Sequence, residues 1–184
     1  VGKRGVEGVR MADGHDIDAR CVISNAGVFN TFERLLAPEV SEGFGYAGRL
    51  RGVRRSMASI CLYIGLEETA ESLGLPKTNY WIYPSNDYDG ALDAFLADPK
   101  APFPVVYISF PSAKDPDYEN RHPGTATIEI VAPAPYEQVA RWRGTTWGKR
   151  GDDYASLKED LSQRLLRHLY DKLPQLAGRI DYYE

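Results

Sequence analysis

The chain has 184 residues, of which 43% are apolar, so it is long enough and apolar enough to bury a core of its own. Its 22 Lys and Arg residues are outnumbered by 26 Asp and Glu residues, and the formal net charge of −4 argues against a nucleic-acid-binding protein. No apolar run approaches the roughly 18 residues of a membrane-spanning helix. The composition therefore predicts a globular protein.

A hairpin and a buried strand are the first predicted elements. Residues 5–11 and 15–19 alternate like two strands, and Gly14 between them can adopt the positive φ of a tight turn. The apolar run at 21–23 lacks polar alternation, which is typical of a strand covered on both faces. The small residues at 24–27 end it. Because small residues at the carboxyl end of such a strand allow a ligand to approach the backbone, we expect a binding edge there.

The two cysteines, Cys21 and Cys61, lie in apolar strand-like runs rather than in a paired framework. This placement favours reduced thiols in the core and a cytoplasmic protein.

A short helix is predicted next, over residues 31–37, which Thr31 can cap and Pro38 ends. The GFGYAG run at 43–48 has the glycine spacing of a dinucleotide-binding turn. That site needs a buried strand before the first glycine and a helix after the last, and the flanking residues favour neither. We therefore expect a flexible loop. The cluster Arg49, Arg51, Arg54 and Arg55 could bind an acidic lipid headgroup or a phosphate, although a solvated charged surface is the simpler explanation.

The middle of the chain predicts a sheet. Apolar strand-like runs occupy residues 58–66, 79–84, 103–110 and 125–131, with short helices predicted at 67–73 and 90–97. Because the strands follow one another with few helices between them, they predict a mixed, largely antiparallel sheet with flanking helices, an α+β fold. The loop at 111–124 is longer than a hairpin needs, so we expect it to serve as a gate or a partner surface.

An amphipathic helix is predicted over residues 154–173. Its apolar side chains recur at helical spacing and its charged side chains gather on another face. Ser156 and Glu159 match a capping box, Asp152 or Asp153 are alternative caps, and Pro174 ends the helix. Packing against the sheet is enough to explain the apolar stripe, which consists of Tyr154, Leu157, Leu161, Leu165, Leu169 and Leu173.

Residues with chemical potential are few. His15, His122 and His168 show no paired spacing, so no metal site is expected. Four aromatic residues on or near the predicted strands could line a pocket for a large apolar ligand, or could simply form the core: Trp81, Tyr83, Tyr107 and Phe110. No acid, base or nucleophile can be assigned a catalytic role from the residue types alone.

One long run carries a family resemblance. FPSAKDPDYENRHPGTATIEIV at 110–131, followed by YEQVARW, WGKRGDDYASLK and LPQLAGRI, resembles the retinol saturase branch of the carotenoid isomerase and phytoene desaturase-like flavoproteins. DGHDIDARCVISNAG is similar to that family's return from the flavin domain, and NYWIYPSNDYDG is similar to its substrate-domain strands. The resemblance covers nearly the whole chain.

The resemblance implies an FAD-dependent oxidoreductase that saturates, desaturates or isomerises carbon–carbon double bonds of a lipophilic polyene, retinoid- or carotenoid-like. A nicotinamide cofactor, NAD or NADP, is a further option. By similarity, Asn25, Ala26 and Gly27 are the residues expected near the flavin, and the four aromatic residues are expected to bind substrate. Residues 1–30 would be the edge of the FAD-binding domain and residues 31–184 the substrate-binding domain, incomplete at its C-terminus.

The family's N-terminal GxGxxG segment and its C-terminal glycine-rich segment have no counterpart here, so we expect a fragment that is inactive by itself. The alternative is a non-catalytic module that binds a lipophilic ligand without flavin, and a nucleotide fingerprint upstream of Val1 would separate the two. In a third hypothesis, the arginines at 49–55 dock a membrane-peripheral protein on anionic lipid. The oligomeric state is not predicted.

Overall fold

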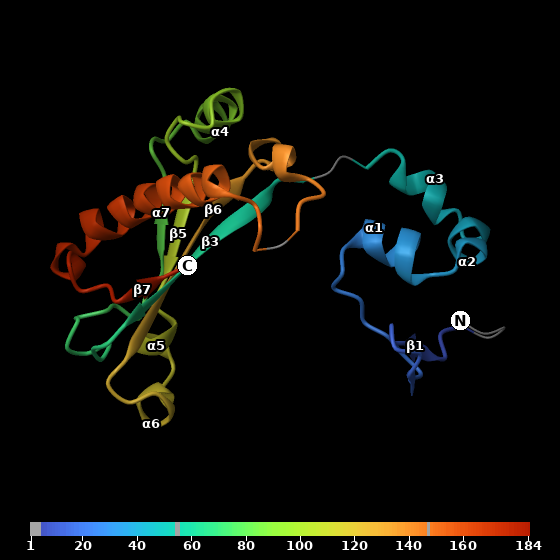
Figure 1. Ribbon diagram of the computed structural model, residues 1–184, viewed down its shortest axis with the longest axis horizontal. Helices are drawn as coiled ribbons and strands as arrows, with labels where there is room; N and C mark the ends of the chain where they lie inside the picture. Colours follow the sequence, from blue (N-terminus) through green and yellow to red (C-terminus); the bar gives the residue numbers. More distant parts are fainter. Residues whose placement is uncertain (1–4, 54–55, 147) are drawn as a thin grey trace. The chain divides into compact units, whose positions relative to one another are not determined.

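The structure is a computed structural model that describes residues 5–53, 56–146 and 148–184 (Figure 1). The chain divides into two compact units, Val1–Ser56 and Met57–Glu184. The expected boundary near residue 30 refers to the domains of the flavoprotein family, and it stays a prediction.

The first unit begins with the predicted hairpin. Strand β1 (Gly8–Arg10) pairs antiparallel with β2 (Asp16–Asp18), and Gly14 in the turn has φ 90°. Across the pair, the Arg10 guanidinium donates to both carboxylate oxygens of Asp16, at 2.7 and 2.9 Å. The alternation of residues 5–19 therefore predicted this hairpin correctly.

The strand predicted at residues 21–23 is not formed. These residues have no regular secondary structure, all three are exposed, and the Ile23 side chain is 93% exposed. A strand covered on both faces needs neighbours to pair with its backbone, and the two strands of this unit's described residues pair with each other. The prediction that Cys21 lies in the core is therefore wrong as well, because its side chain is a free, exposed thiol.

Helical segments fill residues 28–50. Helix α1 (Val28–Asn30) continues into a π-helical turn, η1 (Thr31–Leu35). The helical segment starts three residues before its predicted beginning, so Thr31 lies within it rather than capping it, and its hydroxyl donates back to the Gly27 carbonyl at 2.8 Å. Leu36 is extended, and Pro38 begins the next helix.

The GFGYAG run joins two short helices instead of forming a flexible loop. Helix α2 (Pro38–Gly43) ends at its first glycine, Gly45 turns the chain with φ 71°, and α3 (Tyr46–Leu50) follows. The Phe32 and Tyr46 rings stack with centroids 4.2 Å apart, which holds this turn against η1. Because a helix and not a strand precedes the first glycine, the run lacks the context of a dinucleotide site.

The second unit is built on a five-stranded antiparallel sheet in the order β4-β5-β6-β3-β7. Its long central strands, β3 (Ala58–Leu66) and β6 (Ala126–Ala134), pair along their whole length. The shorter strands are β4 (Tyr80–Ile82), β5 (Val106–Ser109) and β7 (Tyr182–Tyr183). The expected α+β fold with a largely antiparallel sheet is confirmed.

Short helices connect the strands. The helix predicted at 90–97 is α4 (Tyr88–Ala97), which begins two residues earlier, after Asp87, whose carboxylate accepts from the Gly90 N–H at 2.9 Å. The loop at 111–124 holds α5 (Pro111–Lys114) and α6 (Tyr118–Arg121). Three 3₁₀ turns complete the unit: η2 (Tyr136–Gln138), η3 (Ala140–Trp142) and η4 (Pro174–Leu176).

The helix predicted at residues 67–73 is a turn instead. The Thr69 hydroxyl accepts from the Ser72 N–H at 3.1 Å, and the Ser72 hydroxyl donates to the Thr69 carbonyl at 3.0 Å. Such local side-chain bonds offer the backbone an alternative to the helical ladder.

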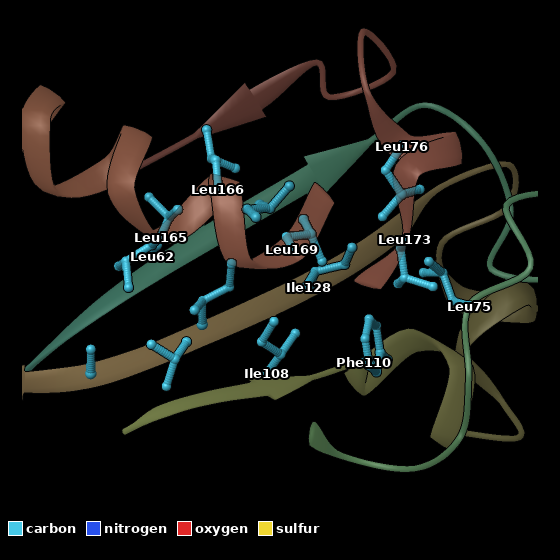
Figure 2. Close-up of a cluster of buried hydrophobic side chains, with 14 of the residues drawn as sticks. Leu62, Leu75, Ile108, Phe110, Ile128, Leu165, Leu166, Leu169, Leu173 and Leu176 are labelled. Carbon is cyan, nitrogen blue, oxygen red and sulfur yellow. The ribbon is translucent and has the colours of Figure 1, made fainter. Parts of the chain in front are cut away.

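Helix α7 (Asp152–Lys172) covers one face of the sheet (Figure 1). Gly151, with φ 79°, precedes it, and no side chain forms a capping bond there, so neither predicted cap is used. Leu165, Leu166 and Leu169 are buried against the sheet, where Figure 2 shows them facing strand residues that include Leu62, Ile108 and Ile128. The first half of the predicted stripe, Tyr154 to Leu161, is only half-buried.

Candidate functional site

The face of the sheet opposite α7 carries one continuous line of large side chains across four strands. Trp81 of β4 pairs with Tyr107 of β5, Tyr107 with Val131 of β6, and Val131 with Cys61 of β3. Directly paired residues point to the same side of a sheet, and their strand neighbours point to the other side, into the core. We call Trp81, Tyr107, Val131 and Cys61 the apolar row.

The apolar row is accessible. The Trp81 side chain is 63% exposed, Cys61 is exposed, and Tyr107 and Val131 are half-buried. The Trp81 and Tyr107 rings are in contact, with centroids 4.7 Å apart and planes inclined at 54°. The prediction that Cys61 is a core thiol is wrong, because the alternation along β3 places it on this face while Leu62 enters the core.

A second row, which is polar, lies on the same face, two residues along each strand from the apolar row. Glu129 of β6 pairs with Ser109 of β5 and with Tyr63 of β3. Hydrogen bonding with Cys61 raises the pKa of Tyr63, and the charges of Cys61 and Glu129 raise that pKa further. The Tyr63 hydroxyl is accessible, since the residue is 56% exposed. The face thus combines an apolar line with an adjacent line of hydrogen-bonding groups.

Lys114, the last residue of α5, reaches the end of the polar row. Its ammonium donates to the Ser109 hydroxyl at 2.8 Å and to the side-chain oxygen of Asn79 at 2.7 Å. Asn79 directly precedes β4, and Ser109 ends β5. The contact therefore places a positive charge where the Trp81–Tyr107 pair ends.

The four aromatic residues expected to bind substrate do not all lie together. Trp81 and Tyr107 belong to the apolar row. Tyr83 follows β4, is exposed, and contacts the Tyr88 ring edge-on at a centroid distance of 4.8 Å. Phe110 is fully buried on the α7 side, as Figure 2 shows, and packs edge-on against Tyr80 at 5.5 Å.

The residues expected near a flavin lie in the first unit. Asn25, Ala26 and Gly27 are exposed and lead directly into α1. The Asn30 side-chain amide donates to the Ala26 carbonyl at 2.9 Å, which fixes the turn. Gly27 has φ 80°, a conformation that favours glycine, and no atom lies within 4 Å of the position a Cβ would take.

Two of the four arginines in the basic cluster can be placed. Arg49 and Arg51 are exposed at the end of α3, whereas Arg54 and Arg55 lie outside the described residues. Membrane docking through this cluster stays a prediction. In the part of the chain that the structure describes, no helix is both long and apolar enough to cross a bilayer.

A crevice of about 170 Å³ opens between the first half of α7 and β3. Its walls are mainly apolar and include the half-buried Leu157 and Leu161. Lys158 and Glu184 add charge to the lining. This crevice opens on the α7 side of the sheet, and its lining also includes Cys61 of the apolar row.

The three histidines lie on different elements: His15 precedes β2, His122 follows α6, and His168 is on α7. His168 is half-buried on α7, and burial lowers its pKa. Over residues 5–53, 56–146 and 148–184, no group of three or more potential metal-ligating side chains is found.

Cys61, Val131 and Lys114 were not predicted as site residues from the sequence. The alternation of residues 58–66 and 126–134 could have indicated Cys61 and Val131. Every second residue in these strands is smaller or more polar than the leucines and isoleucines that face the core, which predicts that it lies on the other face. Lys114 has no such signal, since its contact with Asn79 joins residues 35 positions apart in the chain.

Comparison with known proteins gives consistent relatives. The chain is 35% identical over 181 residues to the all-trans-retinol 13,14-reductase of Macaca fascicularis, covering 95% of this chain and 30% of that protein. It is 34% identical over 176 residues to the inactive all-trans-retinol 13,14-reductase of Danio rerio, covering 90% and 28%. It is 29% identical over 164 residues to the lycopene-forming phytoene desaturase of a Paracoccus species, covering 88% and 31%. No family model matches the chain.

The sheet has one helix-covered face and one accessible, partly aromatic face. The similarity to an all-trans-retinol 13,14-reductase and to a phytoene desaturase, along most of this chain, confirms the resemblance noted in its sequence. The chain spans about 30% of the length of the curated relatives it matches.

Proposed function

We propose that this chain is the main part of the substrate-binding domain of an FAD-dependent oxidoreductase that acts on carbon–carbon double bonds of a lipophilic polyene. The apolar row carries the proposal. A conjugated chain is long, flat and apolar, and the row presents such a surface across four adjacent strands, which at about 4.8 Å per strand extends about 14 Å. The names of the relatives, a retinol reductase and a phytoene desaturase, support the same substrate class.

Trp81 and Tyr107 would contribute most to binding. Aromatic side chains bury large areas at low entropic cost, and their faces stack well on a conjugated system. Val131 and Cys61 extend the apolar contact toward β3. A ligand lying on this row would remove water from the face, and the polar row beside it would fix the ligand's lateral position.

FAD, when bound, would supply hydride transfer. The turn at Asn25–Gly27 would allow a flavin to approach the backbone closely, because Gly27 has no side chain and the space where a Cβ would project is open.

A non-catalytic lipophile-binding module is the second candidate. The crevice between α7 and β3 favours it, because a cavity of about 170 Å³ with apolar walls can hold a small apolar group without any flavin. A relative described as inactive shows that this sequence pattern also occurs in a protein without the reductase activity.

The visible absorption spectrum tests the flavin part of the proposal. The protein is purified from the gene's whole reading frame, beside residues 1–184 alone. We expect flavin bands in the first sample and none in the second. The absence of flavin from both would reject the oxidoreductase and leave the lipophile-binding module.

Polyene titration tests the substrate surface separately. Trp81→Ala should weaken binding of all-trans-retinol at least about tenfold, because it removes the largest exposed ring of the row. Leu96→Ala is the matched control, since Leu96 is an exposed apolar residue of α4, outside the sheet. Equal affinities of the two variants would reject the apolar row as the binding surface.

A further inference from the structure

The ammonium of Lys114 lies beside the apolar row, not on an isolated part of the surface. Ser109, which accepts one of its hydrogen bonds, is two residues beyond Tyr107 on β5. Asn79, which accepts the other, is two residues before Trp81. Two residues along a strand correspond to about 7 Å. The Lys114 ammonium therefore lies beside the side chains that are next to Trp81 and Tyr107 on the same face of the sheet.

The two hydrogen bonds hold the lysine in place. Lysine side chains are usually mobile, but here the Nζ position is set by two acceptors, Asn79 just before β4 at 2.7 Å and Ser109 at the end of β5 at 2.8 Å. An ammonium has three N–H donors, and the two bonds use two of them. The third donor is available to an acceptor that arrives along the sheet face.

We propose that Lys114, positioned by Asn79 and Ser109, is a specificity-determining residue: it makes the site select polyenes that end in an oxygen-bearing group over hydrocarbon polyenes. This inference rests on the proposed function. A polyene lying on the apolar row with its end past Trp81 and Tyr107 would bring a terminal oxygen to the ammonium. A hydrocarbon end would instead displace water from the charge and return no hydrogen bond, which is costly.

The neighbouring carboxylate refines the choice of end group. Glu129 pairs with Ser109 in register, so it lies on the next strand of the same polar row. A hydroxyl group can accept from Lys114 and donate toward Glu129. A carboxylate end group would form a charge-assisted bond with Lys114, but it can donate no hydrogen bond and would be repelled by Glu129. The site should therefore favour an alcohol over an acid of the same carbon skeleton.

The test compares three ligands of one skeleton: all-trans-retinol, all-trans-retinoic acid, and the hydrocarbon in which a methyl group replaces the terminal CH₂OH of retinol. Binding to the chain is followed by quenching of tryptophan fluorescence. For the wild type we expect the alcohol to bind about tenfold tighter than the hydrocarbon, the ratio that one hydrogen bond to a charged group provides. The acid should fall between them.

Lys114→Met keeps the aliphatic stem and removes the charge. It should reduce the alcohol-to-hydrocarbon ratio to about one, because it weakens binding of the alcohol and removes the desolvation cost that a hydrocarbon end meets at the ammonium. Lys114→Arg should largely retain the ratio. Lys100→Met is the matched control, because Lys100 is an exposed lysine that precedes β5 and lies outside this face. A thermal melt of each variant separates loss of selectivity from loss of the folded state.

The outcomes distinguish this inference from the proposal it rests on. If Lys114→Met retains the wild-type ratio, Lys114 does not determine specificity, even though polyenes bind. If none of the three ligands binds, or if Trp81→Ala changes no affinity, the apolar row is not the substrate surface and both conclusions fall.

Discussion

Arg164 of α7 donates hydrogen bonds to two backbone carbonyl oxygens in the segment that leads into β5. Nη1 lies 2.9 Å from the oxygen of Pro99, and Nη2 lies 2.7 Å from the oxygen of Ala101. The guanidinium also lies over the Phe103 ring, 4.4 Å from its centroid. One side chain therefore joins the helix to a loop more than 60 residues earlier in the sequence.

Replacing this side chain should destabilise the second unit. Arg164→Met removes both hydrogen bonds and the cation–π contact, and we expect a loss of about 2 kcal/mol in the free energy of unfolding. Urea unfolding followed by circular dichroism measures it. Arg167→Met, an exposed site on the same helix, should change stability by less than about 0.5 kcal/mol. Equal losses in the two variants would contradict a specific role for Arg164.

His168 makes the stability of this unit depend on pH. It lies on α7 with its ring centroid 6.4 Å from that of Phe103. Burial is the largest effect on its pKa and lowers it. Among the charged groups around it, Asp171 acts in the opposite direction, and a smaller lowering comes from Arg164, Arg167 and Lys172.

The sign follows from proton binding. Because the pKa of His168 is lower in the folded state, the unfolded chain binds more protons once the pH falls below about 6.5. Stability should therefore decrease as the pH falls from about 6.5 through the folded-state pKa. His168→Gln should lose less stability than the wild type over this window, measured as the free energy of unfolding at pH 7.0 and about 5.5. Parallel pH profiles of the two proteins would show that this histidine is not the cause.

The elements that sequence alone predicted are those whose pattern is local and strong. Residues 58–66 and 125–131 became β3 and β6 because their alternating apolar residues match the strand period. Helix α7 followed from leucines at helical spacing, and the sheet buries their C-terminal half. In each case the pattern predicts the type of secondary structure and also the face that is buried, because the apolar residues all lie on one face.

The wrong predictions depended on partners that a local pattern does not contain. Residues 21–23 are apolar enough for a buried strand, but a strand also needs neighbours for its backbone. Thr69 and Ser72 form side-chain bonds that replaced a predicted helix with a turn. The site likewise required the register between strands, which is what places Trp81 and Cys61 in one row although they are far apart in sequence from Val131.

Cys61 offers a chemical probe of the apolar row, with Cys21 as its internal control. Both thiols are free and exposed, so a small maleimide should label both. All-trans-retinol lying on the row would cover Cys61 and should slow its labelling at least about fivefold, whereas Cys21, which lies on no strand of this sheet, should react at an unchanged rate. Trp81→Ala should abolish the protection because it weakens the ligand's contact at the other end of the row. Peptide mass spectrometry at timed intervals separates the two sites. Unchanged labelling of Cys61 at saturating retinol would show that the ligand does not lie on the apolar row.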